Sequence, residues 1–175
     1  STLAKGYWIT KEERFRDAAE QASRFAEEKL LRDDMMAHSW CRGEVSDVPG
    51  YLDDYAAFAN AMLDLYQATF RAEWIDTAET LIRLMKEHFQ DTTEGDFYYS
   101  ARSHTHLLTE IKPGMDVPLP SGGTLAALSL LKLGHLKADT AILTEAEQVL
   151  QKRVDKAVQQ PEAFMFTFSA MRFAM

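Results

Sequence analysis

The sequence has few of the residues that stabilise small secreted domains, and no segment built for a membrane. Cys41 is the one cysteine among 175 residues, which excludes an internal disulfide and favours a reducing compartment. No run of about 18 apolar residues occurs, so we expect no transmembrane helix. The first residues lack the apolar run of a signal peptide. We therefore expect a cytoplasmic location and no membrane partner.

Basic residues and glycine are also scarce. The chain carries 27 acidic and 19 basic side chains, a net charge of −8, which argues against nucleic acid as a partner. With 8 glycines and 5 prolines, the composition excludes collagen-like and disordered classes. No phosphate-binding loop, dinucleotide fingerprint or serine-triad order occurs, so we expect no cofactor.

What the sequence does contain is helical periodicity of two alternating kinds. Hydrophobic residues make up 46% of a chain long enough for one domain. Segments with one apolar face alternate with segments that are apolar on nearly all sides and should be buried. Thr10 and Glu13 form a capping-box pattern at the first segment. The one-sided segments are residues 10–31, 73–89 and 140–158, and the buried ones are residues 52–70, 121–134 and 163–174.

This alternation indicates two layers of helices. Inner helices are buried on both sides and outer helices are wet on one, as in closed α/α toroids; a four-helix bundle would be amphipathic throughout. Short strands are expected at residues 37–41, and at 97–100 paired with 107–111 across a polar tip. The predicted fold class is all-α: an α/α toroid fragment of three helical hairpins, with short β-hairpins between them.

Four segments carry a resemblance to a known family. They are residues 50–56 (GYLDDYA), 63–70 (LDLYQATF), 95–100 (GDFYYS) and 120–127 (PSGGTLAA). In this order they resemble YyaL-type, spermatogenesis-associated thioredoxin-domain proteins. Gly123 and Thr124 depart from the Asn-Ser usual in that family.

The resemblance implies a domain organisation. In that family a thioredoxin-like domain precedes a six-hairpin glycosidase-like (α/α)6 domain, which is related in fold to N-acylglucosamine 2-epimerases. Residues 1–175 resemble only the last part of the second domain, so we expect about half of a toroid. The abrupt start at Ser1 is interpreted as the tail of a missing inner helix. The chain has no Cys-x-x-Cys motif, so redox chemistry does not carry over.

Asp53 and Asp54 are the candidate catalytic residues. They lie beside Tyr51 and Tyr55, two candidate substrate-binding residues, at the start of a buried helix. In a toroid, the loops at one end of the inner helices line a central funnel, where a carboxylate can act as acid or base on a sugar. The alternative is that the aspartates only cap the helix.

Further candidate substrate-binding residues lie in the connecting segments. His38 and Trp40 share one face of a strand and can stack on a sugar ring or form an apolar lid. Asp116 and Ser121 would lie at the next inner-helix mouth, or act as a turn residue and an N-cap.

Tyr98 and Tyr99 point to opposite sides of their strand, so at most one of them faces the funnel. We expect Tyr98 to bind substrate. His104 and His106 share a strand face, but without further ligands they predict no metal site.

Two functional hypotheses remain open from the sequence. One is a carbohydrate-active domain, a sugar isomerase/epimerase or a relative of glycoside hydrolases, with a carbohydrate ligand. The other is a non-catalytic interaction or scaffold domain. Half a ring would leave apolar flanks exposed, at a cost of ~25 cal/mol per Å². We therefore expect either a homodimer of half-toroids or contact with the missing part of the parent chain.

Overall fold

The computed structural model describes residues 1–101, 111–112, 114–116 and 118–174, and it confirms the all-α class. Residues Pro161–Ala163 form a 3₁₀ turn that begins with proline, whose fixed φ suits a first helical position. Within the described residues, no helix is long and apolar enough to cross a bilayer. The helices of this part of the chain are α1 (Thr2–Thr10), α2 (Glu13–Leu30), α3 (Leu52–Thr69), α4 (Ala72–Phe89), α5 (Gly122–Lys137), α6 (Thr140–Gln159) and α7 (Met165–Ala174).

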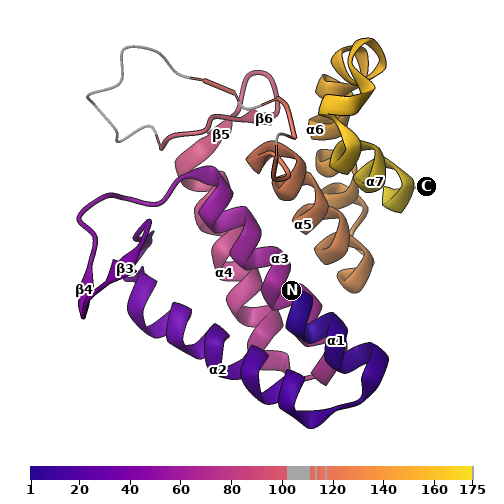
Figure 1. Ribbon diagram of the computed structural model, residues 1–175. Coiled ribbons are helices and arrows are strands. Elements are labelled where there is room, and N and C mark those ends of the chain that lie inside the picture. The colour runs from indigo at the N-terminus through magenta and orange to yellow at the C-terminus, as the bar shows by residue number, and fades with distance from the viewer. Residues whose placement is uncertain (102–110, 113, 117, 175) are drawn as a thin grey trace.

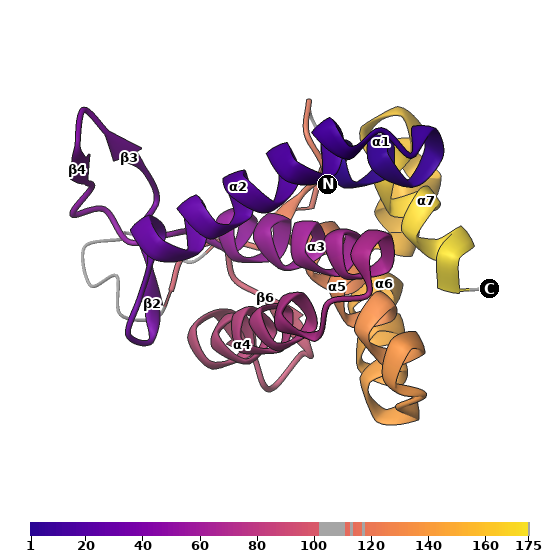
Figure 2. The ribbon, with the colours of Figure 1, turned by 90° about the horizontal axis from the view of Figure 1, so that it is seen from below.

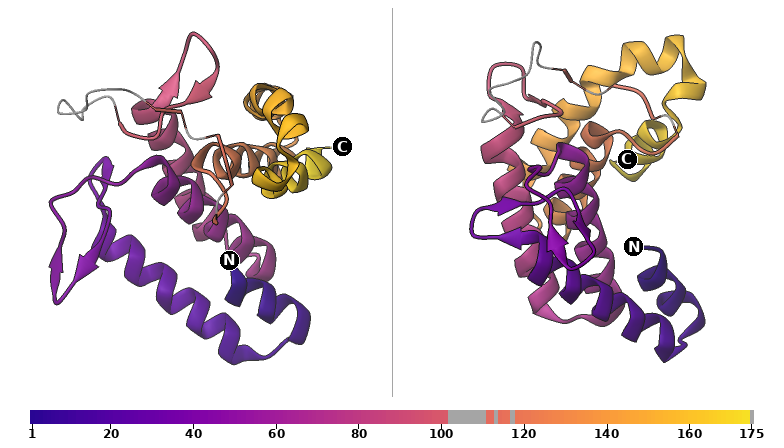
Figure 3. Two further views of the ribbon diagram at one scale, coloured as in Figure 1. Left: turned by 45° about the horizontal axis from the view of Figure 1, so that its top comes forward. Right: turned by 60° about the vertical axis from the view of Figure 1, so that its left-hand side comes forward.

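In the part of the chain that the structure describes, three antiparallel pairs of very short strands lie between the helices. They are β1 (Leu31–Arg32) with β2 (Met35–Met36), β3 (Trp40–Cys41) with β4 (Glu44–Val45), and β5 (Gln90–Asp91) with β6 (Asp96–Phe97). All three pairs lie at the end of the helices where α3 and α5 begin (Figure 3).

The predicted pairing of residues 97–100 with 107–111 is wrong at its first residue. Phe97 pairs with Gln90, because the left-handed Gly95 (φ 68°) closes a tight turn directly before β6. Residues 102–110, with His104 and His106, lie outside the described residues. Further along, the Tyr99 amide donates to the Ile111 carbonyl at 2.8 Å.

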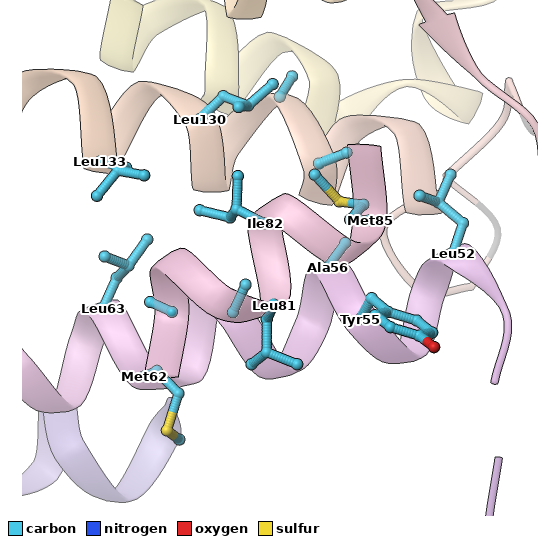
Figure 4. Close-up of a cluster of buried hydrophobic side chains, with 14 of the residues drawn as sticks. Leu52, Tyr55, Ala56, Met62, Leu63, Leu81, Ile82, Met85, Leu130 and Leu133 are labelled. Carbon is cyan, nitrogen blue, oxygen red and sulfur yellow. The ribbon is translucent and has the colours of Figure 1, made fainter. Parts of the chain in front are cut away.

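Helix α3 lies at the centre of the molecule, with α2, α4 and α5 around it (Figures 1 and 2). It forms an antiparallel hairpin with α4, and α5 forms the next hairpin with α6. The apolar side chains of α3, α4 and α5 meet in one core (Figure 4). Leu52, Tyr55, Met62 and Leu63 are each at most 1% exposed, which confirms that α3 is buried on most of its faces.

The α5–α6 hairpin is closed by a glycine. A Cβ atom on Gly134 would lie 2.7 Å from the Leu143 side chain, so only glycine permits this approach. The helix does not end there: it continues to Lys137, and Ala138 adopts the left-handed cap conformation (φ 53°).

Two expectations about the chain's ends are wrong. Thr10 is the last residue of α1 and not the N-cap of the next helix. Lys11 adopts the left-handed conformation (φ 59°) that ends α1 before α2 begins. Glu12, the N-cap residue of α2, makes no side-chain hydrogen bond to the helix start. The last helix is not buried all round: of its described residues only Thr167 and Ala170 are buried, while Met165 and Phe166 are 63% and 46% exposed.

Candidate functional site

A groove of about 720 Å³ runs along the inner face of α3 and α5. Four groove-lining residues of α3 are Asp53, Ala57, Asn60 and Asp64, which follow one another at helical spacing and so share a face. Asp54 and Phe58 of α3 also line the groove. Other groove-lining residues come from α1, α2, α5, α7 and the loops between helices; they include Lys5, Ala26, His38, Pro120, Leu125, Leu128, Lys132 and Phe166. The middle of the groove is mostly apolar, and the ionisable side chains lie towards its two ends.

Asp53 is the carboxylate that the structure leaves least satisfied. Its Oδ1 atom is buried and has no hydrogen-bond partner among the described residues. Burial, and then the negative charge of Asp54, raise the pKa of Asp53, while the backbone of Gly122 offsets part of this rise. A carboxyl group with a raised pKa on a groove keeps its proton to higher pH than an ordinary carboxyl group, which suits a proton donor.

Asp54 has both a structural contact and a contact that faces the groove. Its Oδ2 atom accepts a hydrogen bond from the Tyr51 amide at 2.8 Å, the capping interaction that starts α3. The same oxygen lies 2.8 Å from Nδ1 of His38, so it orients that imidazole. His38 and Asp54 thus form a base and its orienting carboxylate, on the groove that Asp53 also lines.

Aromatic rings stand beside this cluster. Tyr51 stacks on Tyr99, with ring centroids 4.8 Å apart and 11° between the planes, and His38 meets Tyr51 edge-on at 5.2 Å. Burial and the charges of Asp53 and Asp54 raise the pKa of the Tyr99 hydroxyl. Of the two tyrosines that follow β6, Tyr99, which was not among the expected binding residues, is therefore the one that lies near the aspartates.

Tyr98 points the other way. Its hydroxyl donates to Asp91 at 3.0 Å, and the Lys112 ammonium lies 4.9 Å from its ring centroid. That cluster belongs to the β5–β6 turn, where Lys112 and Thr93 hold the pKa of Asp91 well below its usual range. Tyr98 does not line the groove.

Two other expected aromatic residues serve packing. Tyr55 is 1% exposed, and its hydroxyl accepts from the Met36 amide at 2.7 Å, which ties β2 to α3. Trp40 packs edge-on against Phe25 with centroids 5.2 Å apart, on the protruding β3–β4 hairpin. Neither residue lines the groove.

Asp116 and Ser121 form a sealed hydrogen-bond network at the start of α5. Asp116 is 7% exposed and accepts from the Ser121 amide at 2.8 Å and from the amide and hydroxyl of Thr167 at 2.9 and 3.0 Å. Ser121 is the N-cap of α5 and accepts from the Thr124 amide at 3.3 Å. The cap alternative for Ser121 is confirmed, and Asp116 joins α5 to α7 instead of facing the groove.

The sequence analysis missed an ion pair at the other end of the groove. The Lys132 ammonium donates to Asp64 Oδ1 at 2.6 Å, and the two residues are 7% and 5% exposed. Burial raises the pKa of Asp64, but the charge and hydrogen bond of Lys132 outweigh it and leave the pKa lowered. The signal available in the sequence was a charged residue in the middle of each of two mostly apolar helices.

The described residues offer no metal centre. No group of three or more His, Cys, Asp or Glu side chains in this part of the chain is arranged to hold a metal ion. Cys41 is exposed on its hairpin.

The chain matches curated proteins over half of its length, and no protein-family model matches it. Spermatogenesis-associated protein 20 of Rattus norvegicus is 33% identical over 88 residues, which are 50% of this chain and 11% of that protein. The Homo sapiens protein of the same name is 32% identical over 85 residues, 48% of this chain and 11% of that protein. The chain therefore spans about a tenth of the length of these relatives, and the resemblance expected from the sequence is confirmed.

Solved structures of glycoside hydrolase family 76 share the fold. A mannosidase of that family from Bacteroides thetaiotaomicron superposes with a TM-score of 0.70 at 18% identity, over 86% of this chain and 40% of that one. A second family 76 enzyme, from a bovine strain of the same species, gives 0.68 at 18% identity, over 85% of this chain and 32% of the other. At this identity the likeness shows the fold: the chain has the architecture of part of an α/α toroid.

Proposed function

We propose that the groove binds a carbohydrate and that Asp53 transfers a proton to or from it. The observation that carries the proposal is that Asp53 lines the groove while its Oδ1 is buried against Gly122 without a hydrogen-bond partner among the described residues. A buried, ionised carboxylate oxygen without a donor is costly in a purely structural role, whereas a protonated carboxyl group, the form that a general acid needs, avoids that cost. The similar family 76 structures include a mannosidase and an α-mannanase, and this likeness supports a sugar as the ligand.

The arrangement favours proton transfer at a sugar carbon, as in an isomerase or epimerase. Such a reaction needs one group to donate a proton and another to remove one. Asp53, with its raised pKa, suits the acid, and His38, oriented by Asp54, suits the base. In this assignment Asp54 orients the base and caps the helix at the same time.

Glycoside hydrolysis is the second candidate, and the fold likeness favours it. Hydrolysis uses two carboxylates that flank the glycosidic bond. Asp53 and Asp54 would be that pair, with Asp53 protonating the leaving oxygen. Asp54 is less suited to attack or to activate water, because its Oδ2 is occupied by the Tyr51 amide and His38.

The two reactions leave different products, so one experiment tests both. The protein at its full natural length would be incubated in D₂O with a panel of reducing sugars and oligosaccharides. Isomerase or epimerase action incorporates deuterium at carbon, and hydrolysis creates new reducing ends without it. Asp53→Asn should lower the active reaction by about 10²–10⁴-fold, whereas Asp155→Asn, an exposed residue of α6, should leave it unchanged.

The proposal has clear failures. Binding of sugars without turnover, or turnover that survives Asp53→Asn, would remove the acid role. Absence of both binding and turnover would favour the non-catalytic interaction domain that the sequence left open.

We also propose that residues 1–175 form part of a larger ring. The family 76 chains extend well beyond the matched share, and exposed apolar residues such as Trp8, Ile9 and Phe70 (62%, 74% and 80%) need a cover. Further helices of the same ring would supply it, so in the full-length protein Trp8 should be shielded from acrylamide. Comparison of quenching between the wild type and Trp8→Phe measures this. Shielding that appears only at high protein concentration would indicate a homodimer instead.

A further inference from the structure

The end of the groove opposite Asp53 carries an excess of positive charge. Asp64 is the carboxylate at that end among the described lining residues, and two lysines approach it. Lys132 binds its Oδ1 at 2.6 Å, and Lys5 from α1 lies 3.6 Å from its Oδ2, an oxygen that also accepts from the Ser1 hydroxyl. One carboxylate against two ammonium groups leaves a net charge of about +1.

The two lysines differ in what they can contact. The Lys132 side chain is 8% exposed and is fixed by its short bond to Asp64. The Lys5 side chain is 62% exposed, and 3.6 Å is too long for a hydrogen bond, so this ammonium is free to turn towards a ligand. Asp64 and Lys132 alone are enough for an ion pair that joins α3 to α5. Such a structural pair does not require Lys5.

The opposite end of the groove has the other sign. Asp53 and Asp54 lie there with a single imidazole, His38. Asp53 and Asp64 are 11 positions apart on α3, which corresponds to about 16 Å along the helix axis. This separation exceeds the length of a single sugar ring. The wall between the ends is mostly apolar, with Ala57, Phe58 and Leu128 beside the polar Asn60.

We propose that the Lys5–Lys132 end binds an anionic group, a carboxylate or a phosphate, on an oligosaccharide whose reacting sugar lies at Asp53. The inference rests on the proposed function and narrows it to acidic oligosaccharides. The anion lies against Lys5, with Lys132 beneath it and Asp64 holding Lys132 in place. The negative end at Asp53 and Asp54 repels the anionic group, so it sets the direction in which the chain of sugars lies.

Binding to the full-length protein tests the proposal by isothermal titration. Three trisaccharides with the same two leading sugars would be compared, ended by a neutral hexose, by a uronic acid, or by a hexose 6-phosphate. We expect the acidic ligands to bind more tightly than the neutral one, and salt to weaken only the acidic ones. The uronic acid and phosphate arms identify which anion the site prefers.

Lys5→Gln is the decisive variant, because Lys5 is exposed and its loss leaves the Asp64–Lys132 pair intact. Removing one exposed charge contact of up to ~1 kcal/mol should weaken the acidic ligands about three- to fivefold. The neutral ligand should be unaffected. Lys152→Gln, an exposed lysine of α6 away from the groove, is the matched control and should change nothing. Lys132→Gln adds a second test, with circular dichroism to check folding; if it does not fold, Lys5→Gln decides.

The outcomes separate this inference from the proposed function. Tighter acidic binding that Lys5→Gln weakens by about three- to fivefold supports it. Equal binding of neutral and acidic ligands, or acidic binding that ignores Lys5→Gln, overturns it and leaves the carbohydrate proposal standing. Failure of all three ligands to bind, together with inactivity in the D₂O assay, overturns both.

Discussion

The starts of α3 and α5 carry similar residues but differ in how their aspartates are hydrogen-bonded. Each begins an inner helix with an aspartate nearby, and each was expected to carry site residues. At α5, both oxygens of Asp116 are occupied by donors from the Ser121 amide and from Thr167. At α3, Asp53 lines the groove and keeps an oxygen that is buried against Gly122 without a hydrogen-bond partner among the described residues.

The difference lies in what packs in front of each helix. The first turn of α7 supplies the Thr167 amide and hydroxyl, and the Asp116 amide donates to the Ala163 carbonyl at 2.7 Å. At Asp53 the Gly122 backbone offsets only part of the effect of burial, and Oδ1 has no hydrogen-bond partner among the described residues. A carboxylate at a helix start is thus structural when neighbouring amides saturate it, and a candidate for chemistry when they do not.

Asp116→Ala should give the largest effect on stability. It leaves two buried amides and the Thr167 hydroxyl without their acceptor, at a cost of about 3–5 kcal/mol in unfolding free energy. Urea denaturation monitored by circular dichroism measures this. Because Asp116 does not line the groove, sugar binding by the folded fraction should be unchanged. A loss below about 1 kcal/mol would remove the contrast between the two helix starts.

Gly122→Ala tests the point where the two helix starts touch. An added Cβ would lie 2.1 Å from Asp53 Oδ1 and 2.9 Å from Leu52, so one of these groups must move. We expect a loss of about 1–3 kcal/mol, typical of overpacking. Asp53 would also shift relative to the groove, so turnover should fall even at temperatures where the variant is folded.

A double-mutant cycle separates the two contacts of that methyl group. In an Asp53→Ala background the cost of Gly122→Ala should be smaller, because only the Leu52 contact remains. An unchanged cost would mean that Asp53 is not held against α5 by Gly122.

Much of the fold followed from periodicity. Residues 52–70 and 73–89 were predicted from their apolar patterns, and α3 and α4 match them within a residue or two. The N-cap role of Ser121 was also predictable, because an N-cap contacts only residues that lie close to it in the sequence. The capping-box pattern at Thr10 and Glu13 gave a wrong prediction. The pattern does not show that Thr10 is already the last residue of a preceding helix. The apolar composition of α7 did not predict its exposure, since hydrophobicity gives no information about which neighbours are present.

The site was predicted in part for a similar reason. Asp53, Asp54 and His38 meet on the groove as expected, whereas Asp116 depends on Thr167, which is 51 positions away in sequence. Asp64 and Lys132 are 68 positions apart, so only the packing of α3 against α5 reveals them as a pair. Local sequence patterns therefore predict where a helix starts. Residues distant in sequence decide whether a carboxylate at that start has hydrogen-bond donors for both oxygens.

The smallest expected effect concerns the charge of Asp53 and depends on pH. Because its pKa is raised in the fold, the folded protein keeps this proton to higher pH than the unfolded chain. The Asp53 contribution to stability is therefore fully present below the ordinary carboxyl pKa of ~3.9 and is lost as pH rises through the folded value. Asparagine does not ionise, so the stability of Asp53→Asn relative to wild type should increase as pH rises above ~4 and then level off.

Urea unfolding of both proteins across this pH range measures the difference. Asp64 titrates in the opposite sense, because its pKa is lowered, but it is present in both proteins and cancels in the comparison. The effect should be well below the cost of Asp116→Ala, because Asp53 is only half-buried and solvent screens its charge. A difference that shrinks as pH rises would mean that the amides at the start of α5 stabilise the Asp53 carboxylate. The two helix starts would then be alike, and the case for Asp53 as a proton donor would be lost.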